Sequence, residues 1–263
     1  MKSCPSRDYK LSKLKLIFSQ IGLLLFFIAS WEIGTRIGLL DEFFFSKPTS
    51  IAKLFIQYLK ANQIFKHVFI SLYETALGII IGSAAGIFIA TILWSSEKLS
   101  KLLEPFMVIL NALPKTALAP IMIIWAGTGV SGIVVVAISI LIIVTIISTY
   151  NYFSNIDSEK IKMMQSFRAN KLQTFTKLIF PSNLVNIISI IKVNIGLAWV
   201  GVIVGEFLVS RAGIGYLIMY GGQVFRLDLV MMGVVILSIL AYIMYEIVNM
   251  IEKILLKKRG KGI

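Results

Sequence analysis

The sequence predicts an all-α integral membrane protein with six transmembrane helices. Of its 263 residues, 57% are hydrophobic and only 15% are charged, whereas soluble domains carry about 25% charged residues. The apolar residues also gather in six runs, each long enough to cross about 30 Å of hydrocarbon as a helix. The runs lie at residues 16–36, 68–94, 105–126, 131–150, 183–209 and 230–251.

The first run follows a basic tail, residues 1–15. Secretory signal peptides share this arrangement, but this run is longer than their apolar core and has no small-x-small cleavage site. We therefore expect a retained first helix, a transmembrane domain over residues 16–251 and a second basic tail over residues 252–263. The single cysteine, Cys4, excludes a disulfide framework and a cysteine-based metal site.

Lysine and arginine counts predict that both termini are cytoplasmic, because basic residues collect on the cytoplasmic side of membrane spans. With the N-terminus inside, the inner segments hold 17 basic residues and the outer segments hold seven. The net charge of +13 then reflects topology and attraction to anionic headgroups of the lipid bilayer. A nucleic-acid partner is not expected.

A short helix is expected after Pro48, where Thr49 and Ser50 can cap its start. Its apolar residues recur at the spacing of one helix face, with lysines on the opposite side. They are Ile51, Leu54, Phe55, Tyr58 and Leu59. We expect this helix to lie flat on the outer membrane face.

The second and fifth spans carry glycines four residues apart, which leave a smooth strip where another helix can approach closely. These are Gly78, Gly82 and Gly86 in the second span, and Gly201 and Gly205 in the fifth. We expect them to pack helices together, within the chain or against a second copy.

The third span contains Pro114 and Pro120. Each proline removes one backbone hydrogen bond, so a kinked or interrupted helix is expected. Freed backbone groups at membrane depth are tolerated only against protein or a water-filled cavity. The segment therefore either lines a pathway or forms a packed kink.

Three charged residues of the spans are further pathway candidates: Lys115, Lys192 and Glu206. A charge inside the membrane costs a few kcal/mol unless it reaches the headgroups, pairs or lines water. The two lysines therefore either extend to the inner headgroups or line a cavity that favours an anionic solute. Glu206, near the outer end of the fifth span, is consistent with a gate or with packing.

Residues 151–182 form a long cytoplasmic loop, in which the apolar spacing predicts two short amphipathic helices. The first has Ile161, Met164 and Phe167 on one face; after a break at residues 169–170, the second has Leu172, Phe175 and Ile179 on one face and ends at Pro181. Amphipathic helices at this position need a surface to bind. Either the groove of a soluble partner or the inner leaflet fits them.

Several segments, in this order, resemble one family of transport proteins. They are Ser46-Lys-Pro48, Ser71-Leu72, residues 113–120 and 125–129, the loop that ends at Pro181, and residues 195–199 followed by Glu206 and residues 213–216. Through them, nearly the whole chain resembles the inner-membrane permease subunits of binding-protein-dependent ABC importers. The nearest branch is that of nitrate, sulfonate, taurine and bicarbonate permeases.

The resemblance implies a multi-pass permease of the bacterial inner membrane that forms the pathway for a small solute. Its partners would be a separate ABC ATPase, which binds ATP and Mg²⁺, an extracytoplasmic solute-binding protein and a second permease copy, in a homodimer or a heterodimer. The chain itself would be non-catalytic and hold no cofactor, and it contains no G-x-x-x-x-G-K-[ST] phosphate loop. An anionic solute, such as a sulfonate, nitrate or taurine, fits the two lysines; a vitamin or pyrimidine precursor is the alternative.

The resemblance also implies that the 151–182 loop docks on the ATPase, through Ile161, Met164, Phe167, Arg168, Ala169, Leu172, Phe175 and Pro181. The chain departs from the family pattern at several positions, among them Arg168 and Glu74. Arg168 stands where a glycine is expected, so we expect it to occupy the turn with ordinary backbone angles, outside the left-handed region. Glu74 stands where the family tends to have a basic residue.

Two other classes of protein are less compatible with the sequence. An intramembrane enzyme needs a nucleophile and a base, or metal ligands, within its spans, yet the only histidine is His67, at the outer edge of the second span. A stand-alone channel or secondary transporter also has broken helices and buried charges. It has no use, however, for two docking helices on the cytoplasmic side.

Overall fold

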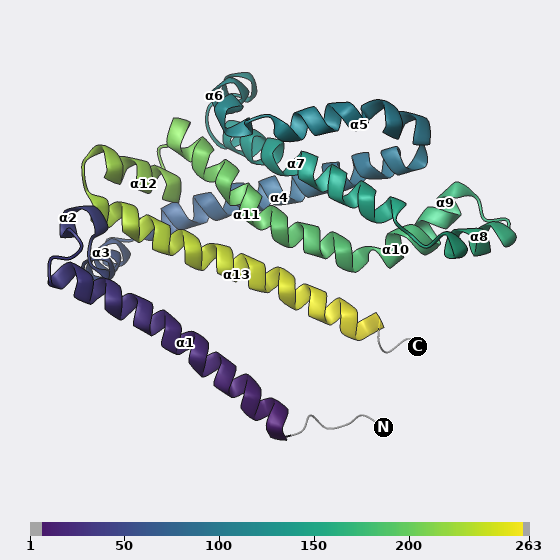
Figure 1. The fold of residues 1–263 in the computed structure, drawn as a ribbon. Helices are drawn as coiled ribbons and strands as arrows, with labels where there is room; N and C mark the ends of the chain where they lie inside the picture. Colours follow the sequence, from purple (N-terminus) through teal and green to yellow (C-terminus); the bar gives the residue numbers. More distant parts are fainter. Residues whose placement is uncertain (1–6, 260–263) are drawn as a thin grey trace.

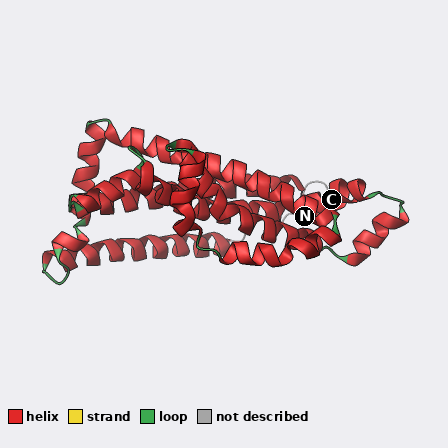
Figure 2. Cartoon of the chain, turned by 90° about the horizontal axis from the view of Figure 1, so that it is seen from above, coloured by secondary structure: helices red, strands yellow, loops and turns green. Residues whose placement is uncertain are grey.

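The computed structural model describes the backbone of residues 7–259 and the side chains of residues 15, 16 and 18–257. Cys4 lies outside the described residues, as do the outermost parts of both predicted tails. Within residues 7–259 the regular structure is entirely helical, and the long helices run roughly alongside one another (Figures 1 and 2). The predicted all-α membrane fold is therefore confirmed.

Five of the described helices are long and apolar enough to cross a membrane by length and composition. They are α1 (Arg7–Arg36), α4 (Gln63–Ser95), α7 (Val130–Ser154), α11 (Leu184–Val209) and α13 (Leu227–Arg259). A sixth candidate is the bent pair α5 (Glu97–Ala112) and α6 (Lys115–Ala126). The other helices are α2 (Glu42–Phe45), α3 (Pro48–Lys60), α8 (Ser158–Ser166), α9 (Lys171–Thr174), the π-helical turn η1 (Phe175–Ile179), α10 (Phe180–Ser182) and α12 (Ile214–Gln223).

The elements outside the long helices gather at two ends of the bundle. Helices α8, α9 and α10, which belong to the 151–182 loop, project from one end (Figure 1). Helices α2, α3 and α12 lie at the other end, which we call the opposite end. The bundle thus presents a different set of short helices at each of its ends.

The bent pair differs from the single kinked span that the sequence predicts at residues 105–126. Helix α5 starts earlier, at Glu97, and α6 leaves it at an angle of 98°. The break falls at Leu113, which has extended angles (φ −62°, ψ 135°) because the following proline disfavours a helical conformation. Pro120, in contrast, lies inside α6. Only Pro114 interrupts the helix.

Helix α7 forms the centre of the bundle and packs against both α4 and α11. Glycines permit both contacts. A Cβ atom added at Gly86 of α4 would lie 2.7 Å from the Cβ of Thr145, and one at Gly205 of α11 would lie 3.0 Å from the Cα of Ile133. Gly78, Gly82 and Gly201 make similarly close contacts with α7, at Ala137 and Leu141. All five glycines thus lie at helix contacts within the chain.

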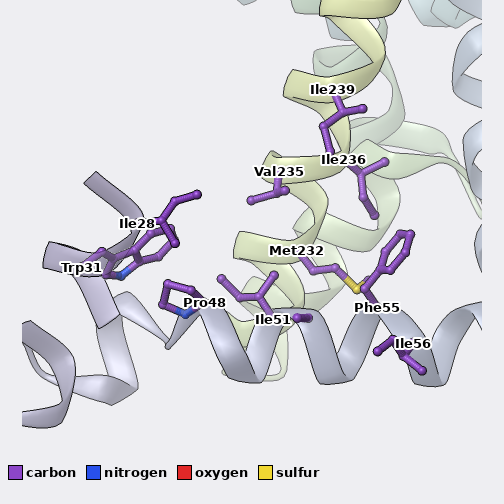
Figure 3. Close-up of a pocket in the computed structure, with 11 residues that line it drawn as sticks. Ile28, Trp31, Pro48, Ile51, Phe55, Ile56, Met232, Val235, Ile236 and Ile239 are labelled. Atoms are coloured by element: carbon purple, nitrogen blue, oxygen red, sulfur yellow. The ribbon is translucent and has the colours of Figure 1, made fainter. Parts of the chain in front are cut away.

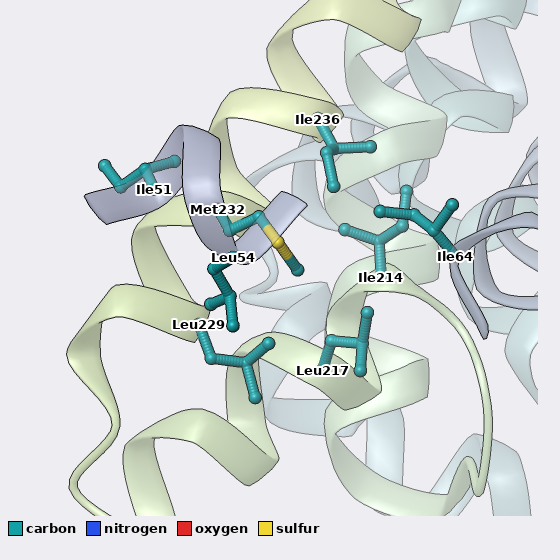
Figure 4. Packing of buried hydrophobic residues seen from close by; sticks show 8 residues of the cluster. All are labelled: Ile51, Leu54, Ile64, Ile214, Leu217, Leu229, Met232 and Ile236. Atoms are coloured by element: carbon teal, nitrogen blue, oxygen red, sulfur yellow. The ribbon is translucent and has the colours of Figure 1, made fainter. Parts of the chain in front are cut away.

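Helix α3 packs its apolar face on protein. Ile51 and Leu54 are buried in a cluster with residues of α12 and α13, among them Leu217 and Met232 (Figure 4). The sequence predicts that this face rests on the membrane surface. That prediction is wrong for the two buried residues, because the hairpin of α12 and α13 provides a protein surface beneath them.

An apolar cavity of about 440 Å³ separates parts of α1, α3 and α13 (Figure 3). Ile28 and Trp31 of α1 line one wall, and Met232 and Val235 of α13 line another. Elsewhere α1 is exposed, as shown by Leu23 and Phe26, which are each 71% exposed. Such surfaces are suited to lipid tails, which are as apolar as the side chains themselves.

Candidate functional site

The turn between α8 and α9 is a Schellman motif, a hydrogen-bonded end of a helix. The Ala169 N–H donates to the carbonyl of Met164 at 3.0 Å, and the Arg168 N–H donates to the carbonyl of Gln165 at 2.8 Å. Arg168 has a φ of +54°, in the left-handed region. The expectation of ordinary angles is therefore wrong, because this turn requires a left-handed residue whichever side chain is present.

Large apolar side chains flank this turn. Phe167 is 76% exposed and Leu172 is 70% exposed. Ile161, Met164 and Ala169 are half-buried. The structure thus brings Phe167 and Leu172 together with Arg168 on a projecting surface at the end of the bundle. We call these three residues the projecting turn.

The three apolar residues of the second predicted helix differ in burial. Phe175 packs against Trp94 and Phe153, with ring centroids 5.3 and 5.4 Å apart, and Ile179 is fully buried, whereas Leu172 points away from the bundle. The predicted single helix is divided here into α9, the π-helical turn η1 and α10. Pro181 lies just beyond η1 and has no N–H to continue an α-helical ladder. Phe175 therefore anchors the loop to the bundle.

At the opposite end, Glu206 joins three helices through a fully buried carboxylate. Its Oε1 accepts a hydrogen bond from the Ser71 hydroxyl of α4 at 2.5 Å. Its Oε2 accepts from the Gly215 and Tyr216 N–H groups, in the first turn of α12, at 2.6 and 3.3 Å. A carboxylate at this position is stabilised by the unpaired N–H groups and the positive end of the helix dipole.

The chain entering α12 is fixed by the same group of residues. The Ile214 N–H donates to Ser71 Oγ at 2.8 Å, and His67 Nδ1 lies 3.0 Å from both the backbone N and the backbone O of Gly213. Gly213 has a φ of +123°, and any Cβ there would collide with the Glu206 carboxylate. Between the two readings of Glu206 as a gate or a packing residue, these contacts favour packing.

The two membrane lysines lie in different environments. Lys192 of α11 forms an ion pair with Glu252 of α13 at 2.5 Å, and its Nζ also donates to Asn249 Oδ1 at 3.1 Å. Lys115 donates to the Asn111 carbonyl at 3.1 Å, across the break between α5 and α6. Because Glu252 neutralises Lys192, this lysine offers no free positive charge to an anionic solute.

Asn194 is a buried polar residue that the sequence analysis does not single out. Its Nδ2 donates to Ser83 Oγ of α4 at 2.9 Å and to Thr145 Oγ1 of α7 at 2.8 Å. One amide thereby links the three central helices. The available signal was an amide side chain in the middle of an apolar run, where a polar group needs a partner.

Comparisons with known proteins agree with this architecture. The family model described as "Binding-protein-dependent transport system inner membrane component" matches residues 78–259. The putative aliphatic sulfonates transport permease protein SsuC of Bacillus subtilis is 30% identical over 89% of this chain and 84% of its own length. The formylaminopyrimidine transport permease protein ThiX of Halalkalibacterium halodurans is 26% identical over 88% of this chain and 92% of its own length.

A solved structure shares the fold. It is a bacterial alginate ABC transporter in complex with an alginate pentasaccharide-bound periplasmic protein. One of its chains superposes with a TM-score of 0.66 and 13% identity, over 94% of this chain and 96% of that chain. The helix arrangement described above is therefore that of a known transporter subunit.

Proposed function

The chain belongs to the family of binding-protein-dependent transport system inner membrane components and is an ABC importer permease subunit; on this premise, we propose that a separate ATPase docks on its projecting turn and drives solute import. The observation that carries the proposal is the exposure of Phe167 and Leu172, at 76% and 70%. Both belong to short helices outside the long spans. A groove on a soluble partner fits such helices in the helix-in-groove manner.

The packing of the 151–182 loop against the bundle supports a role in transmitting movement from the ATPase to the long helices. Phe175 packs on Trp94 of α4 and Phe153 of α7, two of the central helices. A displacement of the projecting turn by a partner therefore acts directly on the core of the bundle. Because the chain has no phosphate-loop motif, we assign ATP, Mg²⁺ and hydrolysis to the ATPase.

The remaining assembly follows from the same proposal. A solute-binding protein docks at the opposite end, and a second permease copy completes the pathway in the bacterial inner membrane. Both termini then lie in the cytoplasm, on the side of the 151–182 loop. We propose a small sulfonate-type solute, because one relative is named for aliphatic sulfonates at 30% identity. A pyrimidine precursor is the alternative, supported by the relative named for formylaminopyrimidine.

The test is co-purification of the tagged chain with the ATPase that is expressed with it. We expect one ATPase copy per permease and loss of the ATPase in the Phe167→Asp variant. Phe225→Asp is the matched control, because Phe225 is a phenylalanine of similar exposure, 73%, but lies at the opposite end. ATPase retained by Phe167→Asp would contradict the docking site. ATP-independent uptake by the purified chain alone would support a channel or secondary transporter.

A further inference from the structure

We propose that a cavity at the opposite end of the bundle binds the protonated amino group of a small solute, with the Glu74 carboxylate as its partner. The inference rests on the transport function proposed above and names the chemistry of its solute. The cavity has a volume of about 560 Å³ and lies between α4, the α6–α7 loop and the α11–α12 loop. Small-molecule sites commonly occupy about 300–1,000 Å³.

Glu74 is the charged residue buried in the wall of this cavity. It is only 1% exposed, and its Oε2 is buried without a hydrogen-bond partner among the described residues. None of the ion pairs formed by described side chains includes it. A buried carboxyl oxygen without a partner carries the full cost of its desolvation. A ligand with hydrogen-bond donors removes that cost.

The neighbouring Glu206 shows why Glu74 is the residue left for a ligand. The two carboxyl groups interact, and both are almost fully buried. Glu206 accepts hydrogen bonds from Ser71, Gly215 and Tyr216, so its oxygens are occupied in holding α12. Glu74 shares a hydrogen bond with the Glu206 carboxyl group, but its Oε2 has no donor among the described residues. Of the two adjacent buried carboxyl groups, only Glu206 is supplied with several donors. Glu74 is therefore the group that attracts a cation.

The shape and composition of the cavity favour a small solute with a second polar end. Ile70, Ile133 and Val209 form an apolar part of the wall, while Arg211 is exposed and lines the cavity from the α11–α12 loop. An ammonium group on Glu74 supplies three donors and the opposite charge. An anionic group of the same molecule can bind the Arg211 guanidinium. The site therefore fits an aminoalkyl sulfonate or another small zwitterion.

Taurine and isethionate are the probes for the test, because they share the ethanesulfonate group and differ in carrying an ammonium or a hydroxyl group. Equilibrium binding of each radiolabelled compound is measured on the full chain in lipid nanodiscs, without a solute-binding protein. We expect taurine to bind about tenfold more tightly than isethionate, because its ammonium group forms one charge-assisted hydrogen bond with Glu74 that the hydroxyl group cannot form. Glu74→Gln should reduce this ratio to about twofold, while thermal unfolding shows that the variant is folded.

Arg211→Gln is the control for the shared sulfonate, and it should weaken both compounds equally. The proposal would be overturned if the unaltered chain bound the two probes equally or bound neither. It would also be overturned if Glu74→Gln left the ratio of taurine to isethionate affinity unchanged. A carbodiimide cross-link from Glu74 to a lysine of the solute-binding protein would overturn it too, because it would assign the carboxylate to protein docking. Binding to the chain alone does not require the ATPase, so a failure of ATPase docking is detected separately, by co-purification.

Discussion

The N–H of Ala169 donates to the carbonyl of Met164 and closes the turn between α8 and α9 around a left-handed residue. That residue is Arg168, with a φ of +54°. Glycine adopts this conformation without a steric penalty, whereas a residue with a Cβ does not. The projecting turn therefore stores local backbone strain at the surface that we assign to the ATPase.

Arg168→Gly should stabilise this turn by about 0.5–1 kcal/mol, because it removes the steric penalty of the left-handed angle. Hydrogen exchange of the α8 amide groups is the appropriate measurement, since it reports local opening. Exchange should slow by about two- to fivefold. Ala169→Gly, one residue later, should instead speed exchange because Ala169 is not left-handed. Faster exchange in Arg168→Gly would show that the Arg168 side chain stabilises the turn by more than its left-handed backbone angle destabilises it.

Glu206→Ala should destabilise the protein by at least about 3 kcal/mol, because it leaves several buried donors unpaired. These donors are the Ser71 hydroxyl and the N–H groups of Gly215 and Tyr216. Thermal unfolding in detergent measures the loss, with Glu104→Ala as the control at an exposed carboxylate. Equal melting temperatures for the two variants would contradict the structural role of Glu206.

The contrast between these two sites shows what the sequence can predict here. Hydrophobic runs and amphipathic spacing predict the spans and the 151–182 loop, because both depend on neighbours within a few helical turns. The contact between Ser71 and Glu206 joins residues 135 positions apart, so no local pattern contains it. Nor does a local pattern show which apolar residues of the second loop helix are buried: Phe175 packs on Trp94 of α4 and Phe153 of α7, whereas Leu172 is 70% exposed.

The ion pair between Lys192 and Glu252 provides another prediction, since both side chains are largely buried, at 13% and 15% exposed. Lys192→Met should destabilise the protein by about 3–5 kcal/mol by leaving the Glu252 charge without its partner. The double variant Lys192→Met/Glu252→Leu should recover most of that loss, because it buries no isolated charge. Thermal unfolding of the single and double variants measures both effects. No recovery in the double variant would show that the lysine acts through other contacts, such as Asn249.

Gly86→Ala tests whether α4 and α7 require close approach. An added Cβ would lie 2.7 Å from the side chain of Thr145 in α7, a helix that also packs against α11. Overpacking of this kind typically costs about 1–3 kcal/mol, and the melting temperature should fall accordingly. Gly196→Ala is the matched control, because Gly196 lies in a helix and an added Cβ would meet no atom within 4 Å. Since alanine is the better helix former, this variant should be neutral or more stable. A Gly86→Ala variant as stable as Gly196→Ala would mean that the two helices can separate without cost, and α7 would then not be the fixed centre of the bundle.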